Sequence, residues 1–173
     1  ENASSVYIPN GNLSPAVVEA RLTADVPATL GAFLIDRYEV INSEFQRFVD
    51  AGGYENQAYW THPFMNEGIE HSWTEAMELF VDQTNRSGPA TWAAGSHSEG
   101  QGNYPVTGIS WYEAAAFAAF EGRSLPTVYH WYRVSGQSMS GLIVPASNLL
   151  VGEGLAEAGE FTGASNVGGF DMA

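Results

Sequence analysis

The stretch Tyr104-Pro105-Val106-Thr107-Gly108-Ile109-Ser110-Trp111-Tyr112-Glu113-Ala114 leads from a turn-rich segment into the start of a helix. Ser110 is followed three residues later by Glu113, which is the pattern of a capping box. The serine oxygen accepts an orphan backbone N–H, and the glutamate reaches back to the residue that precedes the helix. The stretch therefore predicts a helix over residues 111–120, rich in alanine and able to pack closely against its neighbours.

The same serine pattern occurs twice earlier in the chain, at Ser43 with Gln46 and at Ser72 with Glu75. It predicts two further helices, of which the first ends near Gly52. The first helix would bury Phe45, Phe48 and Val49, and the second would bury Ala76, Leu79 and Phe80.

Strands are predicted at residues 6–9 and 32–35, with another near Val17-Val18, and a fourth helix near Pro126-Thr127. A long loop over residues 82–108 and a glycine-rich segment over residues 152–169 separate these elements. Short helices within much irregular chain favour an α+β fold with low regular secondary structure.

The charge balance excludes some classes of partner. The 173 residues contain 20 acids against six arginines and no lysine, for a formal net charge of −14. A field of that sign repels phosphate backbones and anionic membrane surfaces, so we expect no nucleic-acid partner and no membrane insertion. The sequence shows no signal peptide and no apolar run long enough to span a bilayer. It does not identify the compartment.

The sequence contains no cysteine, so these residues form no disulfide, no thiolate metal site and no cysteine nucleophile. Four other side chains lie close in sequence and could gather a metal ion: His62, Glu67, Glu70 and His71. A solvated acidic turn before a capped helix is the alternative. We expect His97 to be exposed in its polar loop, and His130 to be a hydrogen-bonded structural histidine among aromatic residues.

Asn148 precedes the glycine-rich segment, whose backbone carbonyls could wrap a hard cation such as calcium. A turn-forming asparagine is the alternative interpretation.

Four sequence motifs, taken together in their order along the chain, indicate a family. They are residues 33–42, residues 104–114, Arg123-Ser124-Leu125-Pro126-Thr127, and Gly168-Gly169-Phe170-Asp171-Met172-Ala173. From Val6 to the last residue the chain resembles the formylglycine-generating-enzyme (sulfatase-modifying factor) domain family. The variant at residues 126–133 resembles a bacterial subgroup that is often attached to other modules such as protein kinases.

The resemblance implies a C-type-lectin-related α+β fold and bound calcium, with the Asn148 side chain and the Leu149 carbonyl as ligands. It implies one domain over residues 1–173 that lacks its C-terminal segment. In the family's oxidase members, two cysteines of that segment bind copper and activate oxygen. This cysteine-free chain is therefore expected to hold no copper site and to be unable to generate formylglycine as it stands.

Two functions follow from the resemblance. The first is a non-catalytic module that binds a protein or small-molecule ligand within a larger bacterial protein. The alternative is the N-terminal part of a sulfatase-modifying-type oxidase, or of a related oxygen-dependent enzyme, whose active site lies beyond Ala173. An incomplete C-terminal edge would leave Phe170 and Met172 exposed or covered by a partner, and could support self-association.

Overall fold

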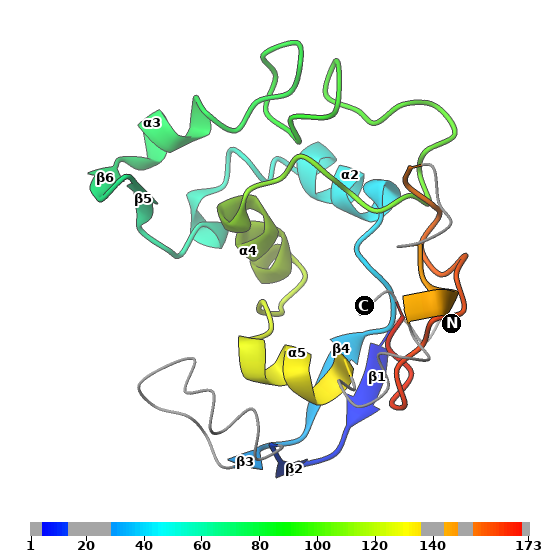
Figure 1. Ribbon diagram of the computed structural model, residues 1–173. Coiled ribbons are helices and arrows are strands. Elements are labelled where there is room, and N and C mark those ends of the chain that lie inside the picture. Colours follow the sequence, from blue (N-terminus) through cyan, green and yellow to red (C-terminus); the bar gives the residue numbers. More distant parts are fainter. Residues whose placement is uncertain (1–4, 14–28, 136–143, 149–153, 171–173) are drawn as a thin grey trace. The chain divides into compact units, whose positions relative to one another are not determined.

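The computed structural model describes residues 5–13, 29–135, 144–148 and 154–170 (Figure 1). The chain divides into two compact units: Glu1–Glu39 with Pro126–Ala173 as unit 1, and Val40–Leu125 as unit 2. Short helices and two-stranded antiparallel sheets make up the regular structure of the described residues, which confirms the predicted α+β class. Within the described residues, no helix is both long and apolar enough to cross a membrane. The prediction of a single domain stays a prediction.

Unit 1 is built on two short strand pairs. Strand β1 (Ser5–Ile8) pairs antiparallel with β4 (Phe33–Asp36), and β2 (Gly11–Asn12) pairs with β3 (Thr29–Leu30). The predicted strands at residues 6–9 and 32–35 are confirmed, each displaced by one residue. The strand predicted near Val17-Val18 lies outside the described residues.

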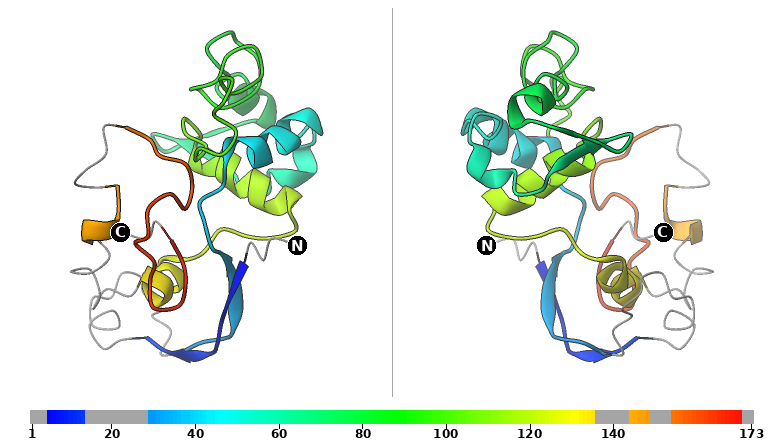
Figure 2. Two further views of the ribbon diagram at one scale, coloured as in Figure 1. Left: turned by 90° about the vertical axis from the view of Figure 1, so that its right-hand side faces the viewer. Right: turned by 90° about the vertical axis from the view of Figure 1, so that its left-hand side faces the viewer.

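Helix α5 (Val128–Ser135) lies beside β1 and β4 (Figures 1 and 2). The ring of His130 packs edge-on against Phe33, with 4.6 Å between ring centroids, and its Nδ1 lies 2.7 Å from Thr127 Oγ1. His130 is therefore a structural residue that joins the start of the helix to the sheet, as its aromatic surroundings predicted. A short 3-10 turn, η3 (Val144–Ala146), follows in the same unit.

Unit 2 carries the other elements and an aromatic core. Its elements are α2 (Asn42–Asp50), η1 (Gln57–Tyr59), β5 (Phe64–Asn66), β6 (Ile69–His71), α3 (Trp73–Met77) and α4 (Trp111–Phe120). Figures 1 and 2 show α2 and α4 side by side. Phe45 stacks on Phe117 at 5.2 Å between centroids and contacts Phe48 at 5.4 Å. These three rings are almost fully buried and join the two helices.

Helix α4 has the predicted bounds. Ser110 Oγ accepts the Glu113 backbone N–H at 3.2 Å, and the Glu113 carboxylate accepts the Ser110 N–H at 2.6 Å, which completes the capping box. The other oxygen of Glu113 accepts the Tyr54 hydroxyl at 2.6 Å. Burial raises the pKa of Glu113, and these hydrogen bonds act in the opposite direction. Ala116 is fully buried, because its small side chain lets the helix approach the aromatic rings.

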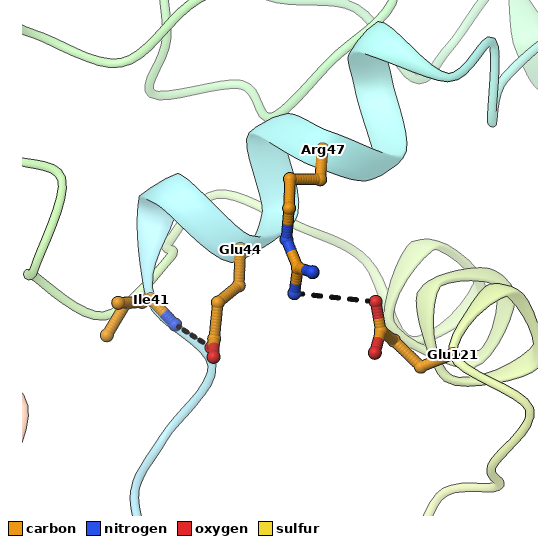
Figure 3. Close-up of polar contacts among 4 residues, drawn as sticks. All are labelled: Ile41, Glu44, Arg47 and Glu121. Carbon is orange, nitrogen blue, oxygen red and sulfur yellow. Dashed lines mark hydrogen bonds and ion pairs between the residues drawn. The ribbon is translucent and has the colours of Figure 1, made fainter. Parts of the chain in front are cut away.

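Helix α2 begins differently from the prediction. Ile41, not Ser43, precedes the helix, and its backbone N–H donates to the Glu44 carboxylate at 3.2 Å (Figure 3). The first free N–H groups of the helix, at Asn42 and Ser43, donate to loop carbonyls at Tyr104 and Gly102, both at 2.9 Å. Because the loop satisfies these groups, no serine cap is needed, and the capping box predicted at Ser43 is wrong.

The predicted burial of Leu79 is also wrong. Helix α3 ends at Met77, and the chain turns so that Leu79 is 62% exposed. Ala76 is buried as predicted, and Phe80 stacks on Trp60 at 5.4 Å between ring centroids. The second capping box, at Ser72 with Glu75, is confirmed by reciprocal hydrogen bonds.

The start of α2 can be tested by substitution. Glu44→Ala should lower the free energy of unfolding by about 1 kcal/mol, because the Ile41 N–H loses its acceptor. Ser43→Ala, at an exposed position, should change it by less than about 0.5 kcal/mol. Urea denaturation of both variants measures the difference, and a larger effect at Ser43 would restore the original capping assignment.

Candidate functional site

The long loop of unit 2 is organised around one buried carboxylate, Asp82. One oxygen of Asp82 accepts the Thr84 N–H and hydroxyl, both at 2.7 Å, and the Arg86 N–H at 3.1 Å. The other oxygen accepts the Gly95 N–H at 2.7 Å. Burial alone would raise the pKa of Asp82, but the hydrogen bonds from Gly95, Thr84 and Arg86 outweigh it and lower the pKa to about 2. The carboxylate therefore holds the two ends of residues 82–95 together.

A second anchor ties the loop to α2. The Asn42 side chain accepts the Trp92 indole N–H at 3.0 Å and donates to the Gln101 carbonyl at 2.9 Å. His97 packs its ring edge against Trp92, 5.6 Å between centroids, and its Nδ1 contacts the Ser98 carbonyl. His97 is partly exposed, so its packing on Trp92 shields it more than the sequence predicted.

The side chains that could have gathered a metal ion do not do so: His62, Glu67, Glu70 and His71 form no metal-binding group. Among the residues described, no three histidine, aspartate or glutamate side chains are grouped closely enough to hold a metal ion. His62 instead packs against Trp111, 4.7 Å between ring centroids. It also lines an apolar crevice beside α4 that has no room for a water molecule. The segment is a hairpin tip, as the alternative interpretation proposed.

Buried polar atoms without a partner are the remaining indication of a site. Within the described part of the chain they are Arg37 Nε, Gln46 Oε1, Trp73 Nε1, Arg133 Nε, Ser135 Oγ and Asn148 Oδ1. A buried polar atom that makes no hydrogen bond costs about 1–3 kcal/mol, so each one requires an explanation.

Asn148 is the residue that the sequence singled out for calcium. Its Nδ2 donates to the Gly154 carbonyl at 2.7 Å, which fixes the orientation of the amide. Its Oδ1 is buried and accepts no hydrogen bond from the described residues. An oriented oxygen without a donor is the geometry that a cation ligand requires. Leu149, the second predicted ligand, lies outside the described residues.

Comparison with known proteins identifies the family. A model of the sulfatase-modifying factor enzyme 1-like domain matches residues 1–153. The chain belongs to this family. The match includes the loop of residues 82–108 and the Asn148 position, and it confirms the resemblance carried by the four motifs.

Curated relatives bear several names. The chain is 28% identical over 154 residues to the formylglycine-generating enzyme of Mus musculus, covering 79% of this chain and 40% of that protein. It is 37% identical over 108 residues to the hercynine oxygenase of Mycobacterium tuberculosis, covering 62% and 23%. It is 28% identical over 131 residues to the inactive C-alpha-formylglycine-generating enzyme 2 of Bos taurus, covering 69% and 43%. The chain thus spans less than half the length of these relatives.

The Asp82 anchor predicts a pH dependence. The hydrogen bonds lower the pKa of Asp82 from its ordinary value of 3.8 to about 2 in the folded protein, so its contribution to stability is complete above about pH 4 and is lost as the pH falls toward 2. Asp82→Ala should remove this contribution and leave the Gly95 and Thr84 N–H groups unpaired, costing about 1–3 kcal/mol at neutral pH.

Thermal unfolding between pH 2 and 6 measures the difference between the wild type and Asp82→Ala. That difference should shrink as the pH falls through the window. Glu55→Gln, at an exposed acid, is the matched control and should unfold in parallel with the wild type. A constant difference between Asp82→Ala and the wild type would contradict the anchoring role.

Proposed function

We propose that this chain acts as a non-catalytic, ligand-binding or interaction module of a larger bacterial protein. The observations that support the proposal are the resemblance of residues 126–133 to a bacterial subgroup that is often attached to other modules, and an acidic sequence without lysine. One relative bears the name of an inactive formylglycine-generating enzyme, which supports a role for this domain without that chemistry. The ligand is a protein or a small molecule.

The construction of the long loop supports a binding role. Asp82 and Asn42 fix the loop by hydrogen bonds to its backbone at several points along its length. A loop that is already ordered presents its exposed residues without the entropic cost of ordering them on binding. Loops held on a rigid scaffold are where binding residues concentrate in proteins. We further propose that the fold is related to that of C-type lectins, as the family resemblance implies.

The alternative is that these residues form the N-terminal part of an oxygen-dependent enzyme. The names of the mouse and mycobacterial relatives favour it, since one is a formylglycine-generating enzyme and the other an oxygenase. In that case the described residues position a catalytic segment located beyond Ala173. Copper bound by cysteines of that segment would activate oxygen, and unit 2 would provide the folded support.

An activity assay separates the two functions. The full natural protein, incubated with a cysteine-containing peptide, copper, oxygen and a thiol reductant, should leave the cysteine unchanged by mass spectrometry. Conversion of the cysteine to formylglycine would overturn the binding-module proposal and establish the alternative. The mouse relative assayed in parallel is the positive control.

We also propose that the domain binds calcium through Asn148. The buried Oδ1, oriented by the Gly154 carbonyl, fits a hard cation, and the Leu149 carbonyl is the second proposed ligand. The ion would join the 3-10 turn that precedes Asn148 to the glycine-rich segment that follows it. Its role would be structural, because a ligand that binds only the folded state stabilises that state.

Chelation tests the calcium site. Addition of calcium after treatment with EGTA should raise the melting temperature, with a stabilisation of about 2.7 kcal/mol when calcium is present at 100 times its dissociation constant. Asn148→Ala should abolish this response. Asn103→Ala, in the other unit, is the matched control and should retain it. Equal melting temperatures with and without calcium in the wild type would refute the site.

A further inference from the structure

Helix α5 begins with a cap made by Thr127 and His130. The Thr127 carbonyl accepts the Trp131 N–H at 3.0 Å, the first hydrogen bond of the helix, so Thr127 is the residue that caps it. Its Oγ1 accepts the His130 backbone N–H at 3.4 Å, and Nδ1 of His130 accepts the Thr127 backbone N–H at 3.3 Å. This reciprocal pair is a capping box in which an imidazole takes the place of the usual Glu or Gln.

The cap specifies the protonation state of the imidazole. A backbone N–H can only donate, so Nδ1 must be an unprotonated acceptor, and the hydrogen of the neutral ring is on Nε2. The Thr127 hydroxyl, 2.7 Å away, can donate to the same nitrogen. A protonated imidazole carries hydrogen on both nitrogens and accepts no hydrogen bond. The capping boxes of α3 and α4 use Glu75 and Glu113 instead, whose carboxylates accept in their charged form.

The sheet beside His130 provides no charge that would favour a protonated ring. The ring packs on Phe33 of β4. The residues that share this face of the β1–β4 pair are apolar: Val6, Ile8 and Ile35. The titratable residues of the two strands, Tyr7 and Asp36, lie on the opposite face, where the Asp36 carboxylate accepts the Ser5 hydroxyl.

The charged side chains of α5 and of the segment after β4 do not compensate a positive ring either. They are Arg133, which follows His130 by about one turn of the helix, and Arg37, and both are cations. The remaining titratable groups of α5 are two phenols, on Tyr129 and Tyr132. Among the described residues no carboxylate forms an ion pair with His130. The start of a helix also disfavours a positive charge, because the positive end of the helix dipole lies there.

We propose that the Thr127–His130 cap is a proton-sensitive latch at the start of α5. Imidazoles take up a proton as the pH falls from about 8 to about 5, and a protonated His130 no longer accepts the Thr127 N–H. The latch matters because α5 contacts both strand pairs of unit 1. Tyr129 is 5% exposed and packs with Leu13 beside β2, and the His130 ring contacts Phe33 of β4. Protonation therefore loosens α5 from the strands in mild acid, whether the whole protein is a binding module or an enzyme.

NMR of the ring nitrogens in the wild-type protein tests the latch without any substitution. At about pH 8 the His130 ring should be the neutral form with its hydrogen on Nε2. As the pH is lowered to about 5, the Thr127 backbone amide signal should shift along the same titration curve as the ring. A neutral ring with its hydrogen on Nδ1, or a Thr127 amide that does not follow the ring, would overturn the proposal.

His130→Gln separates the latch from the other groups that titrate in this pH range. The glutamine amide oxygen can accept the Thr127 N–H and does not titrate. Between about pH 8 and pH 5, the melting temperature of the wild type should therefore fall by about 2–4 °C more than that of His130→Gln, the equivalent of one helix cap. His62→Gln, which removes an imidazole from unit 2, is the matched control and should show the same excess fall as the wild type. Equal pH dependence in the wild type and His130→Gln would refute the latch.

Discussion

The buried side-chain amide of Asn42 connects helix α2 to the long loop of residues 82–108, and the order of unit 2 depends on this connection. Asn42 is only 5% exposed, yet its amide donates to the Gln101 carbonyl and accepts the Trp92 indole, while its backbone N–H donates to Tyr104. One residue thus starts α2, closes the long loop over it and orients a core aromatic ring. Only a side chain with both a donor and an acceptor can do this in a dry interior.

The aromatic core and the polar anchors stabilise each other. The rings of Phe45, Phe48 and Phe117 exclude water, which strengthens each hydrogen bond beside them and penalises any that is lost. Glu113 uses both of its oxygens, one for the cap of α4 and one for the Tyr54 hydroxyl. Asp82 also uses both of its oxygens, which accept backbone N–H groups at Thr84 and Gly95 in the long loop. Irregular chain can be ordered in this fold because buried carboxylates and amides satisfy its backbone in place of a large sheet.

Both units hold buried polar atoms that the described residues leave without a hydrogen-bond partner, among them Gln46 Oε1 in unit 2 and Asn148 Oδ1 in unit 1. Asn148 has a fixed acceptor without a donor, and Arg133 has a buried donor without an acceptor. The unpaired oxygen of Asn148 is the atom on which the calcium proposal rests. Family membership accounts for the fold of the chain, but its relatives bear the names of enzymes with different chemistries and of an inactive protein. Function in this family is therefore decided by sites more than by the fold.

Local sequence determined the elements whose signals are complete within a few residues. Ser110 with Glu113 and the alanine-rich run that follows gave the bounds of α4, because a cap and a helical face are local properties. The strand and helix starts of unit 1 and the structural role of His130 followed in the same way. Only the tertiary structure decided that Ile41 starts α2, that Leu79 is exposed and that His62 packs on Trp111. The tertiary structure alone placed Arg133 over Gly11. All of these contacts join residues that are distant in sequence. No local pattern records which backbone groups a distant loop will satisfy.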